Sequence, residues 1–302
     1  MRARGGAEPG RGMQTAAMNR SGNLRGAGFM AGAACIFAFE ALLVREMIAR
    51  GIPIEVQVMA RALGQVVWTL PFLVARGPAL FATTRAPLHV LRGACSALTW
   101  GLYYWSFAYL DLATATVLSF TNVMFTTLLA QPLLGERVGL ARWAGTLAGF
   151  AGVAVMLRPG AEVSLPGAAI AIAAALAWCG ITLTTRRLTG TDGTPTILAW
   201  LAVVTVLLAA PFAALARQPL GPGDVLWLLG FAAICPAIIV LVTEALRAGE
   251  ASAVAPFQYL RLIIIGALGW LIHAEVPDAW AFLGAGFILL GAVIITVAEA
   301  RA

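Results

Sequence analysis

The stretch TILAWLAVVTVLLAAPFAAL, residues 196–215, runs for 20 positions without a charged side chain. A helix of about 20 apolar residues spans the roughly 30 Å hydrocarbon layer of a bilayer. Similar stretches recur along the 302-residue chain, separated by short loops rich in Gly and Pro. We expect ten such spans, at residues 25–46, 54–75, 88–110, 112–134, 139–157, 165–187, 196–215, 223–245, 250–272 and 279–299.

The composition places almost the whole chain inside a membrane. Of its residues 61% are hydrophobic and 11% are charged, and its mean hydropathy is +0.88. Soluble domains contain about 25% charged residues. We therefore predict an all-α integral membrane protein with the lipid bilayer as its partner. The net charge of +6 does not indicate a nucleic-acid partner, because the arginines lie mainly at span ends and form no basic face.

The distribution of arginines predicts the orientation. If the N-terminus is inside, 13 arginines lie on the cytoplasmic side and 4 on the other, and positive residues favour the cytoplasm. Both termini are therefore predicted to be cytoplasmic in a multi-pass protein of the bacterial inner membrane. Residues 1–22 lack the apolar stretch of a signal peptide, and we expect a disordered tail there.

The chain also repeats itself. Three residue pairs share a separation of 139 positions: Glu136 with Glu275, Gly145 with Gly284, and Gly152 with Gly291. Because each half would contain an odd number of spans, the second copy must enter the membrane in the opposite direction. Inverted repeats are common in secondary transporters, whose binding site lies between the halves near the midplane. We predict ten transmembrane helices as two inverted five-helix repeats, at residues 23–160 and 161–302.

Arg261 is the charged residue that we expect at the greatest depth. It follows about 11 residues of the span 250–272, which places it roughly 16 Å deep at about 1.5 Å per residue. A charge there is costly and usually functional, and a guanidinium can clasp a carboxylate or phosphate of a small-molecule substrate. Gln258 and Tyr259 would join it in a substrate site. A structural arginine, paired with a helix carbonyl or a Glu, is the open alternative.

Glu40 and Arg61 are expected about 10 Å deep on neighbouring spans, where they can pair. The pair is either a permanent salt bridge or a gating and proton-coupling pair that breaks during transport. If the two charges neutralise each other, Arg261 keeps a spare positive charge. That charge favours a substrate with an anionic group, unless Glu244 compensates it.

Ser119 and Asn122 belong to a polar face in the span 112–134. Together with Thr116 and Thr126 they follow spacings of 3, 3 and 4 residues, which bring the side chains to one side of a helix. The repeat sets Asn122 against Tyr259. The face either lines a substrate cavity or forms hydrogen bonds between helices, as Ser and Thr often do in membranes.

Trp100 and Tyr103 belong to an aromatic patch in the span 88–110, together with Tyr104 and Phe107. The patch begins deeper than an interfacial belt would. It either forms walls for a flat substrate or packs against other helices.

Enzyme chemistry has little support in the sequence. The only histidines, His89 and His273, lie at span ends, and the chain has no H-E-x-x-H, G-x-S-x-G or P-loop motif. The four cysteines show no C-x-x-C spacing. We expect no catalytic residue, cofactor or metal. A non-transporting membrane scaffold and, with less support, a membrane-embedded enzyme are the alternatives to a carrier.

Short motifs follow one another in a characteristic order over about residues 24–299. They are Ala60-Arg61, His89-Val90-Leu91-Arg92-Gly93, Leu133-Leu134-Gly135-Glu136-Arg137, Arg142-Trp143, Arg158-Pro159-Gly160, Ala255-Pro256-Phe257-Gln258-Tyr259-Leu260-Arg261-Leu262 and Glu275-Val276-Pro277-Asp278. In this order the chain resembles the EamA-type transporters of the drug/metabolite transporter superfamily.

The resemblance implies ten helices in two inverted repeats. It also implies secondary active transport, by alternating access, of a small metabolite such as an amino acid, vitamin or nucleoside-type compound. Many relatives have Pro where this chain has Asn122, which argues against a bend in that span here. We expect a monomer or homodimer.

Overall fold

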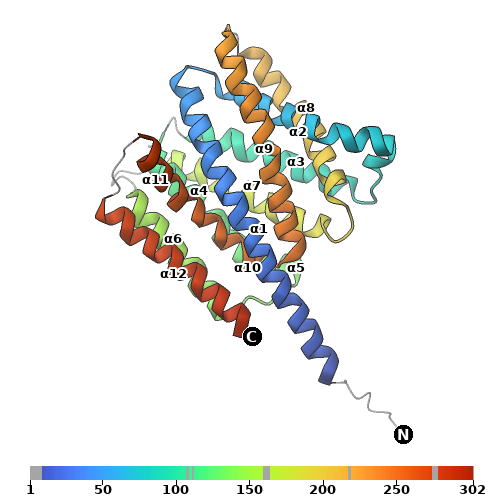
Figure 1. Cartoon of the computed structure of the whole chain (residues 1–302), viewed down its shortest axis with the longest axis vertical. Helices are drawn as coiled ribbons and strands as arrows, with labels where there is room; N and C mark the ends of the chain where they lie inside the picture. The colour runs from blue at the N-terminus through green and yellow to red at the C-terminus, as the bar shows by residue number, and fades with distance from the viewer. Residues whose placement is uncertain are drawn as a thin grey trace.

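The computed structural model describes residues 9–106, 109–110, 112–158, 164–216, 219–273 and 278–301. Within these ranges the regular structure is entirely helical (Figure 1). The α-helices are α1 (Pro9–Ala49), α2 (Ile54–Arg76), α3 (Ala86–Ser106), α4 (Leu112–Ser119), α5 (Thr121–Leu134), α6 (Leu140–Leu157), α7 (Leu165–Leu188), α8 (Thr194–Leu215), α9 (Pro222–Ala248), α10 (Ala251–Val254), α11 (Leu260–His273) and α12 (Ala279–Arg301). Two 3-10 helices, η1 (Gly77–Phe81) and η2 (Ala255–Tyr259), complete the order.

Nine helical stretches in the described residues are long and apolar enough to cross a membrane. They correspond in position to nine of the ten expected spans. The helix at the remaining expected span, α3, has 21 residues but is not among the nine. His89, Arg92 and several aromatic residues lower its mean hydropathy.

The first helix is longer than the apolar pattern predicts. Its membrane-length part begins at Ser21, close to the expected start of the first span. The helix itself begins at Pro9, within the segment 1–22 where we expected disorder. Residues 13–18 include Gln, Met and Ala, which favour helices, so the helix continues beyond the apolar part. Residues 1–8 lie outside the described residues.

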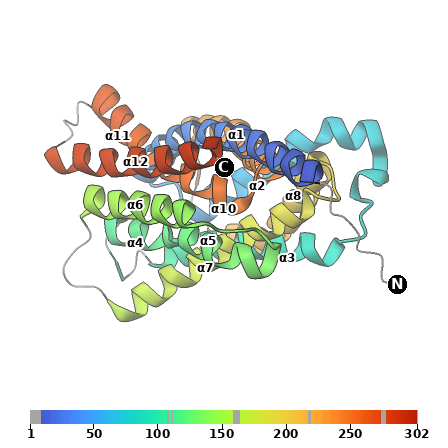
Figure 2. The same ribbon diagram turned by 90° about the horizontal axis from the view of Figure 1, so that it is seen from below.

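Helices from the two halves of the chain pack against each other in matching pairs. α1 packs on α9 as α3 packs on α7, and α2 packs on α8. α6 lies along α12 in both views (Figures 1 and 2). Exchange of the two halves turns the contact of α1 with α9 into that of α7 with α3. The first residues of α1 and the last residues of α12 lie at the same end of the bundle (Figure 1).

Glycines allow α6 and α12 to approach closely. A Cβ on Gly145 would lie 2.7 Å from the carbonyl oxygen of Gly291, and a Cβ on Gly152 would lie 2.5 Å from that of Gly284. Small residues permit such backbone contact between membrane helices. Since the earlier glycine of α6, Gly145, lies against the later glycine of α12, Gly291, and Gly152 lies against Gly284, the two helices are antiparallel. These four glycines are the residues that the 139-position repeat relates.

Two expected spans are interrupted near their middle. The span 112–134 divides into α4 and α5 at Phe120, although the residues around it include no Pro or Gly. The expectation that a span with Asn122 in place of Pro has no bend is therefore wrong, since the helix is interrupted there without a Pro. Three side chains supply the reason: Ser119 Oγ donates to the Thr116 carbonyl, Thr121 Oγ1 to that of Leu118 and Asn122 Nδ2 to that of Ser119. Such bonds compete with the helical hydrogen-bond pattern.

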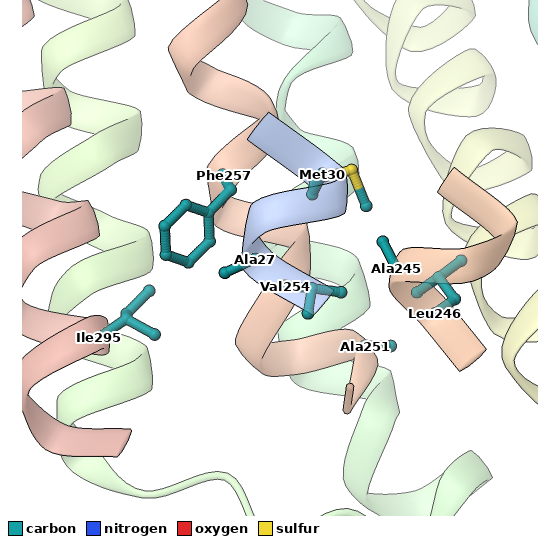
Figure 3. Close-up of a cluster of buried hydrophobic side chains, with 8 residues drawn as sticks. All are labelled: Ala27, Met30, Ala245, Leu246, Ala251, Val254, Phe257 and Ile295. Atoms are coloured by element: carbon teal, nitrogen blue, oxygen red, sulfur yellow. The ribbon is translucent and has the colours of Figure 1, made fainter. Parts of the chain in front are cut away.

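The span 250–272 is interrupted by the 3-10 helix η2. Pro256 lies in its first turn and provides no backbone N–H, which removes a helical hydrogen bond. The two interruptions meet, because the ring centroids of Phe120 and Tyr259 are 5.4 Å apart. An apolar cluster lies next to η2 and joins α1, α9 and α12 to it, as Figure 3 shows. The cluster contains Ala27, Met30, Ala245, Leu246, Ala251, Val254, Phe257 and Ile295.

Candidate functional site

One arginine and three aromatic rings gather where the two helix interruptions meet. Arg261 lies in the first turn of α11, directly after η2. Its guanidinium carbon is 4.2 Å from the ring centroid of Phe120, 5.2 Å from that of Trp178 and 5.5 Å from that of Phe37. We call Arg261 and these three rings the arginine cage. The cage draws its residues from α1, α7, α11 and the junction of α4 with α5.

Arg261 has no anionic partner within the cage. In the part of the chain that the structure describes, no carboxylate forms an ion pair with it and no oxygen accepts a hydrogen bond from it. The side chain is partly exposed. Cation–π contacts, worth about 0.5–2 kcal/mol each, stabilise the charge without using its N–H groups. The forked donors therefore remain available to a carboxylate or phosphate.

A buried ion pair joins Glu40 on α1 to Arg61 on α2. The guanidinium carbon of Arg61 lies 4.6 Å from the ring centroid of Trp100, and Cys235 Sγ donates a hydrogen bond of 3.4 Å to Glu40 Oε1. Among the described residues, Glu40 Oε2 has no hydrogen-bond partner. Separation from Arg61 would leave this carboxylate as an uncompensated charge between apolar helices, which is costly.

Two tryptophans connect the arginine cage to this ion pair. The ring centroids of Trp100 and Trp178 are 5.8 Å apart, and that of Phe37 lies 6.3 Å from Trp178. All three rings are partly exposed. The arrangement offers flat apolar surfaces between a paired guanidinium, that of Arg61, and an unpaired one, that of Arg261.

Ser119 and Asn122 direct their polar groups into the interruption between α4 and α5. Ser119 Oγ donates to the Thr116 carbonyl at 2.8 Å, and Asn122 Nδ2 donates to the Ser119 carbonyl at 2.8 Å. Both residues are buried. Tyr103 on α3 reaches the same polar face, since its hydroxyl lies 3.0 Å from Thr116 Oγ1. The face thus connects two helices beside the cage.

Gln258 and Tyr259 are buried, with exposed fractions of 6% and 1%. A Cβ on Gly149 would lie 2.4 Å from the Tyr259 ring, so any larger residue at this position would clash with the ring. In the described residues, the Tyr259 hydroxyl and Asn122 Oδ1 have no hydrogen-bond partner. An unpaired buried polar atom costs about 1–3 kcal/mol. A ligand or conformational change that supplies partners would recover that free energy.

Sequence reasoning missed the three rings of the cage. Phe120 lies within the polar face between Ser119 and Asn122, which is a signal that could have identified it. Phe37 and Trp178 stand in apolar spans, where aromatic residues are common and indicate no site by themselves.

A second polar region lies at the end of the bundle where α1 begins and α12 ends. Glu136 follows α5, and its carboxylate accepts hydrogen bonds from the backbone N–H groups of Ala251 at 2.7 Å and Ser252 at 2.9 Å. It also accepts one from the Ser252 hydroxyl at 2.7 Å. These bonds satisfy the N–H groups at the start of α10, which have no partner within the helix.

Arg142 on α6 is the centre of this second region. It forms ion pairs with Glu250 and with Glu299, the latter at 2.8 Å, and donates to Ser252 Oγ at 2.8 Å. Asn23 on α1 donates to Glu299 at 2.6 Å and accepts from the backbone N–H of Glu250 at 2.7 Å. We call the set the termini-end network: Asn23, Glu136, Arg142, Glu250, Ser252 and Glu299.

The described residues contain no group of three or more His, Cys, Asp and Glu side chains that could hold a metal ion. All four cysteines are free thiols. We assign no residue of the described chain to a metal or a cofactor.

A family model for EamA-like transporters matches residues 24–158 and matches again at residues 165–297. The chain belongs to the EamA-like transporter family. It is therefore a transporter and not an enzyme, and its apolar helices make it a multi-pass membrane protein.

Several curated bacterial relatives are similar over most of their length. A riboflavin transporter of Rhizobium johnstonii is 33% identical over 78% of this chain and 78% of its own. An S-adenosylmethionine uptake transporter of Rickettsia bellii is 30% identical over 77% and 80%. One crystal structure, at 18% sequence identity, matches 91% of this chain and 98% of its own with a TM-score of 0.80, which shows a shared fold.

Proposed function

We propose that this chain is a secondary active transporter that moves a small metabolite across the bacterial inner membrane by alternating access. Its substrate would be a compound of the size of an amino acid, vitamin or nucleoside. The relatives that carry riboflavin or S-adenosylmethionine support this size range. The observation on which the proposal chiefly depends is the arginine cage, in which a charge with no anionic partner lies between apolar helices of both halves.

Ten transmembrane helices in two inverted repeats, residues 23–160 and 161–302, form part of the proposal. Its main support is the contact between α6 and α12. The repeat relates Gly145 to Gly284 and Gly152 to Gly291, yet Gly145 contacts Gly291 and Gly152 contacts Gly284. Such crossed pairing is what a two-fold axis between equivalent, antiparallel helices produces. An axis of this kind in the membrane plane relates inverted repeats.

The substrate would bind between the halves at the cage. We assign the anionic contact to Arg261 and flat contacts to Trp100 and Tyr103. Ser119, Asn122, Gln258 and Tyr259 are buried in this conformation, so they would contact substrate as the halves move. The unpaired Tyr259 hydroxyl and Asn122 Oδ1 support this role.

Alternating access requires that one end of the path be closed. The termini-end network joins Asn23 and Arg142 from the first half to Glu250 and Glu299 from the second. The excess of arginine expected on this side supports a cytoplasmic location for this end. We therefore interpret the conformation as one closed toward the cytoplasm, in which Glu40 and Arg61 are paired. Opening would separate the network, and the Glu40–Arg61 pair would act as the gating and proton-coupling element.

Counterflow in sealed liposomes tests the transport function. Purified protein would be reconstituted, loaded with an unlabelled metabolite from a panel that includes riboflavin and S-adenosylmethionine, and offered the same labelled compound outside. A carrier gives saturable, transient accumulation of at least one unmodified compound. A scaffold gives none, and an enzyme returns a chemically changed solute, so either result would refute the proposal.

A further inference from the structure

We propose that the arginine cage selects flat, conjugated organic anions, and that neutral and cationic compounds with the same ring are poor ligands. The carboxylate or phosphate of the ligand would contact the N–H edge of Arg261, and its ring would lie against Trp178 and Trp100. The inference depends on the carrier function proposed above and adds the chemical class of the substrate.

The balance of charge is the first argument. Glu40 neutralises Arg61 in a buried pair. Glu244, which could have compensated Arg261, pairs instead with Arg247 at 3.4 Å and accepts a hydrogen bond from Thr194. The site formed by Glu40, Arg61 and Arg261 therefore carries one positive charge in excess. An anion removes this excess, whereas a cation doubles it in surroundings that screen charge weakly.

The donor groups of Arg261 are the second argument. Its guanidinium touches three rings, none of which is an oxygen acceptor for an N–H group. A guanidinium has five N–H donors in a fixed fork that matches a carboxylate or phosphate. Such a bidentate pair gives both strength and orientation. A neutral amide can accept from this fork at one oxygen only.

The arrangement of rings is the third argument. The Trp178 ring lies near both the Arg261 guanidinium and the Trp100 ring, with interplanar angles of 39° to Phe37 and 46° to Trp100. All three rings are partly exposed. Tilted rings at these distances leave faces that a flat ligand can stack on, at about 0.5–1.5 kcal/mol per ring pair. An aliphatic acid would satisfy Arg261 but use none of these faces.

Two matched sets of probes test the class. The first is indole-3-acetate, indole-3-acetamide and tryptamine, which share one ring and carry a negative, a zero and a positive charge. The second is flavin mononucleotide against riboflavin, which share a ring system and differ by a phosphate. Binding to detergent-purified protein would be measured by isothermal titration calorimetry and by thermal shift. We expect the anion of at least one set to bind at least about tenfold more tightly than its neutral partner, as expected for a hydrogen-bonded charge pair.

The two sets also identify the anionic group. Preference in the indole set alone indicates a carboxylate site, and preference in the flavin set alone indicates a phosphate site. The inference is wrong if no anion binds, or if in neither set the anion binds more tightly than the neutral and cationic compounds that share its ring.

Three variants connect the selectivity to Arg261. Arg261→Gln should reduce anion affinity at least about tenfold and leave the affinity for the neutral partner unchanged. Arg261→Lys keeps the charge and should retain part of the anion preference. Arg158→Gln removes an exposed arginine paired with Asp278 at a helix end, and should change neither affinity. Size-exclusion chromatography verifies folding, and the wild-type probe sets test the class even if Arg261→Gln does not fold.

Failure of this inference differs from failure of the carrier function. If an anion binds selectively but shows no counterflow in liposomes, the ligand class stands and the carrier function does not. If a neutral or cationic compound shows counterflow and the anions do not, the carrier function stands and the ligand class is wrong.

Discussion

The arginine cage and the termini-end network both place arginine among helices of the two halves, but they treat its charge differently. In the network, Arg142 has two carboxylate partners and a hydroxyl acceptor. In the cage, Arg261 has aromatic rings and, among the described residues, no acceptor at all. An arginine whose N–H donors have acceptors holds helices together, whereas one whose donors face only rings can bind the acceptor groups of a ligand.

The Glu40–Arg61 pair lies between these extremes. Its two charges are matched, yet Glu40 keeps one oxygen without a partner in the described residues. The following predictions test whether the network is primarily structural, the pair switchable and the cage a binding site.

Glu136→Ala should have the largest effect on stability. It removes the acceptor for two buried N–H groups and one hydroxyl at the start of α10. We expect a loss of about 5 kcal/mol, the upper end of the range for breaking a buried charged contact. Thermal unfolding in detergent measures it. Glu46→Ala, which removes an exposed ion pair with Arg50, is the control and should cost less than about 1 kcal/mol. Equal losses of stability in the two variants would show that the hydrogen bonds of Glu136 contribute no more than an exposed ion pair.

Glu40→Gln should cost about 3 kcal/mol, because it removes the carboxylate that neutralises the buried charge of Arg61. The double variant Glu40→Gln with Arg61→Gln removes both charges and should recover most of this stability. Transport by the double variant should no longer respond to a pH gradient, provided that the wild type does. Glu55→Gln, at an exposed position in the first turn of α2, is the control. If transport by the double variant responds to a pH gradient as the wild type does, the pair is a permanent salt bridge and takes no part in proton coupling.

Gly149→Ala should cost about 1–3 kcal/mol through overpacking. The added Cβ would lie 2.4 Å from the Tyr259 ring, which packs on Phe120 of the cage. We also expect weaker ligand binding, measured by isothermal titration calorimetry, because Phe120 contacts Arg261. Gly28→Ala is a matched control, since no atom lies within 4 Å of the Cβ that it adds. If both variants behave alike, the Tyr259 contact does not support the cage.

Asp278→Asn should have the smallest effect. Asp278 precedes α12, and its pKa is lowered because its carboxylate accepts the backbone N–H of Ala281 and lies beside Arg158. A lowered pKa in the folded state contributes stability above the usual pKa range of Asp, and this contribution disappears as the pH falls through the folded pKa. The melting temperatures of wild type and variant should therefore differ slightly at neutral pH and converge in acid. A difference that grows in acid would contradict this role.

Part of the fold could be read from residue order alone. Nine expected spans have a counterpart among the membrane-length helices of the described chain. The expected depth of Arg261 in its span predicted a functional role for it. The equal expected depths of Glu40 and Arg61 on neighbouring spans predicted that the two residues pair. Each of these inferences uses position along a helix, which the sequence contains directly.

The interruption at Phe120 could not be read in this way. Each of the three side-chain bonds that cause it is local, but whether Ser, Thr and Asn bond to their own helix or to a neighbour depends on what packs beside them. The rings of Phe37 and Trp178 were missed for a related reason. Their contact with Arg261 depends on how α1 and α7 are rotated toward α11.

The sequence by itself determined that this protein lies in a membrane and where most of its helices run, because the thickness of the hydrocarbon layer sets the length of an apolar helix without reference to its neighbours. Only the tertiary structure decided that Arg261 is surrounded by rings while Arg142 is surrounded by carboxylates. That distinction arises from side chains far apart in the chain, which are brought together by the packing of helices from both halves.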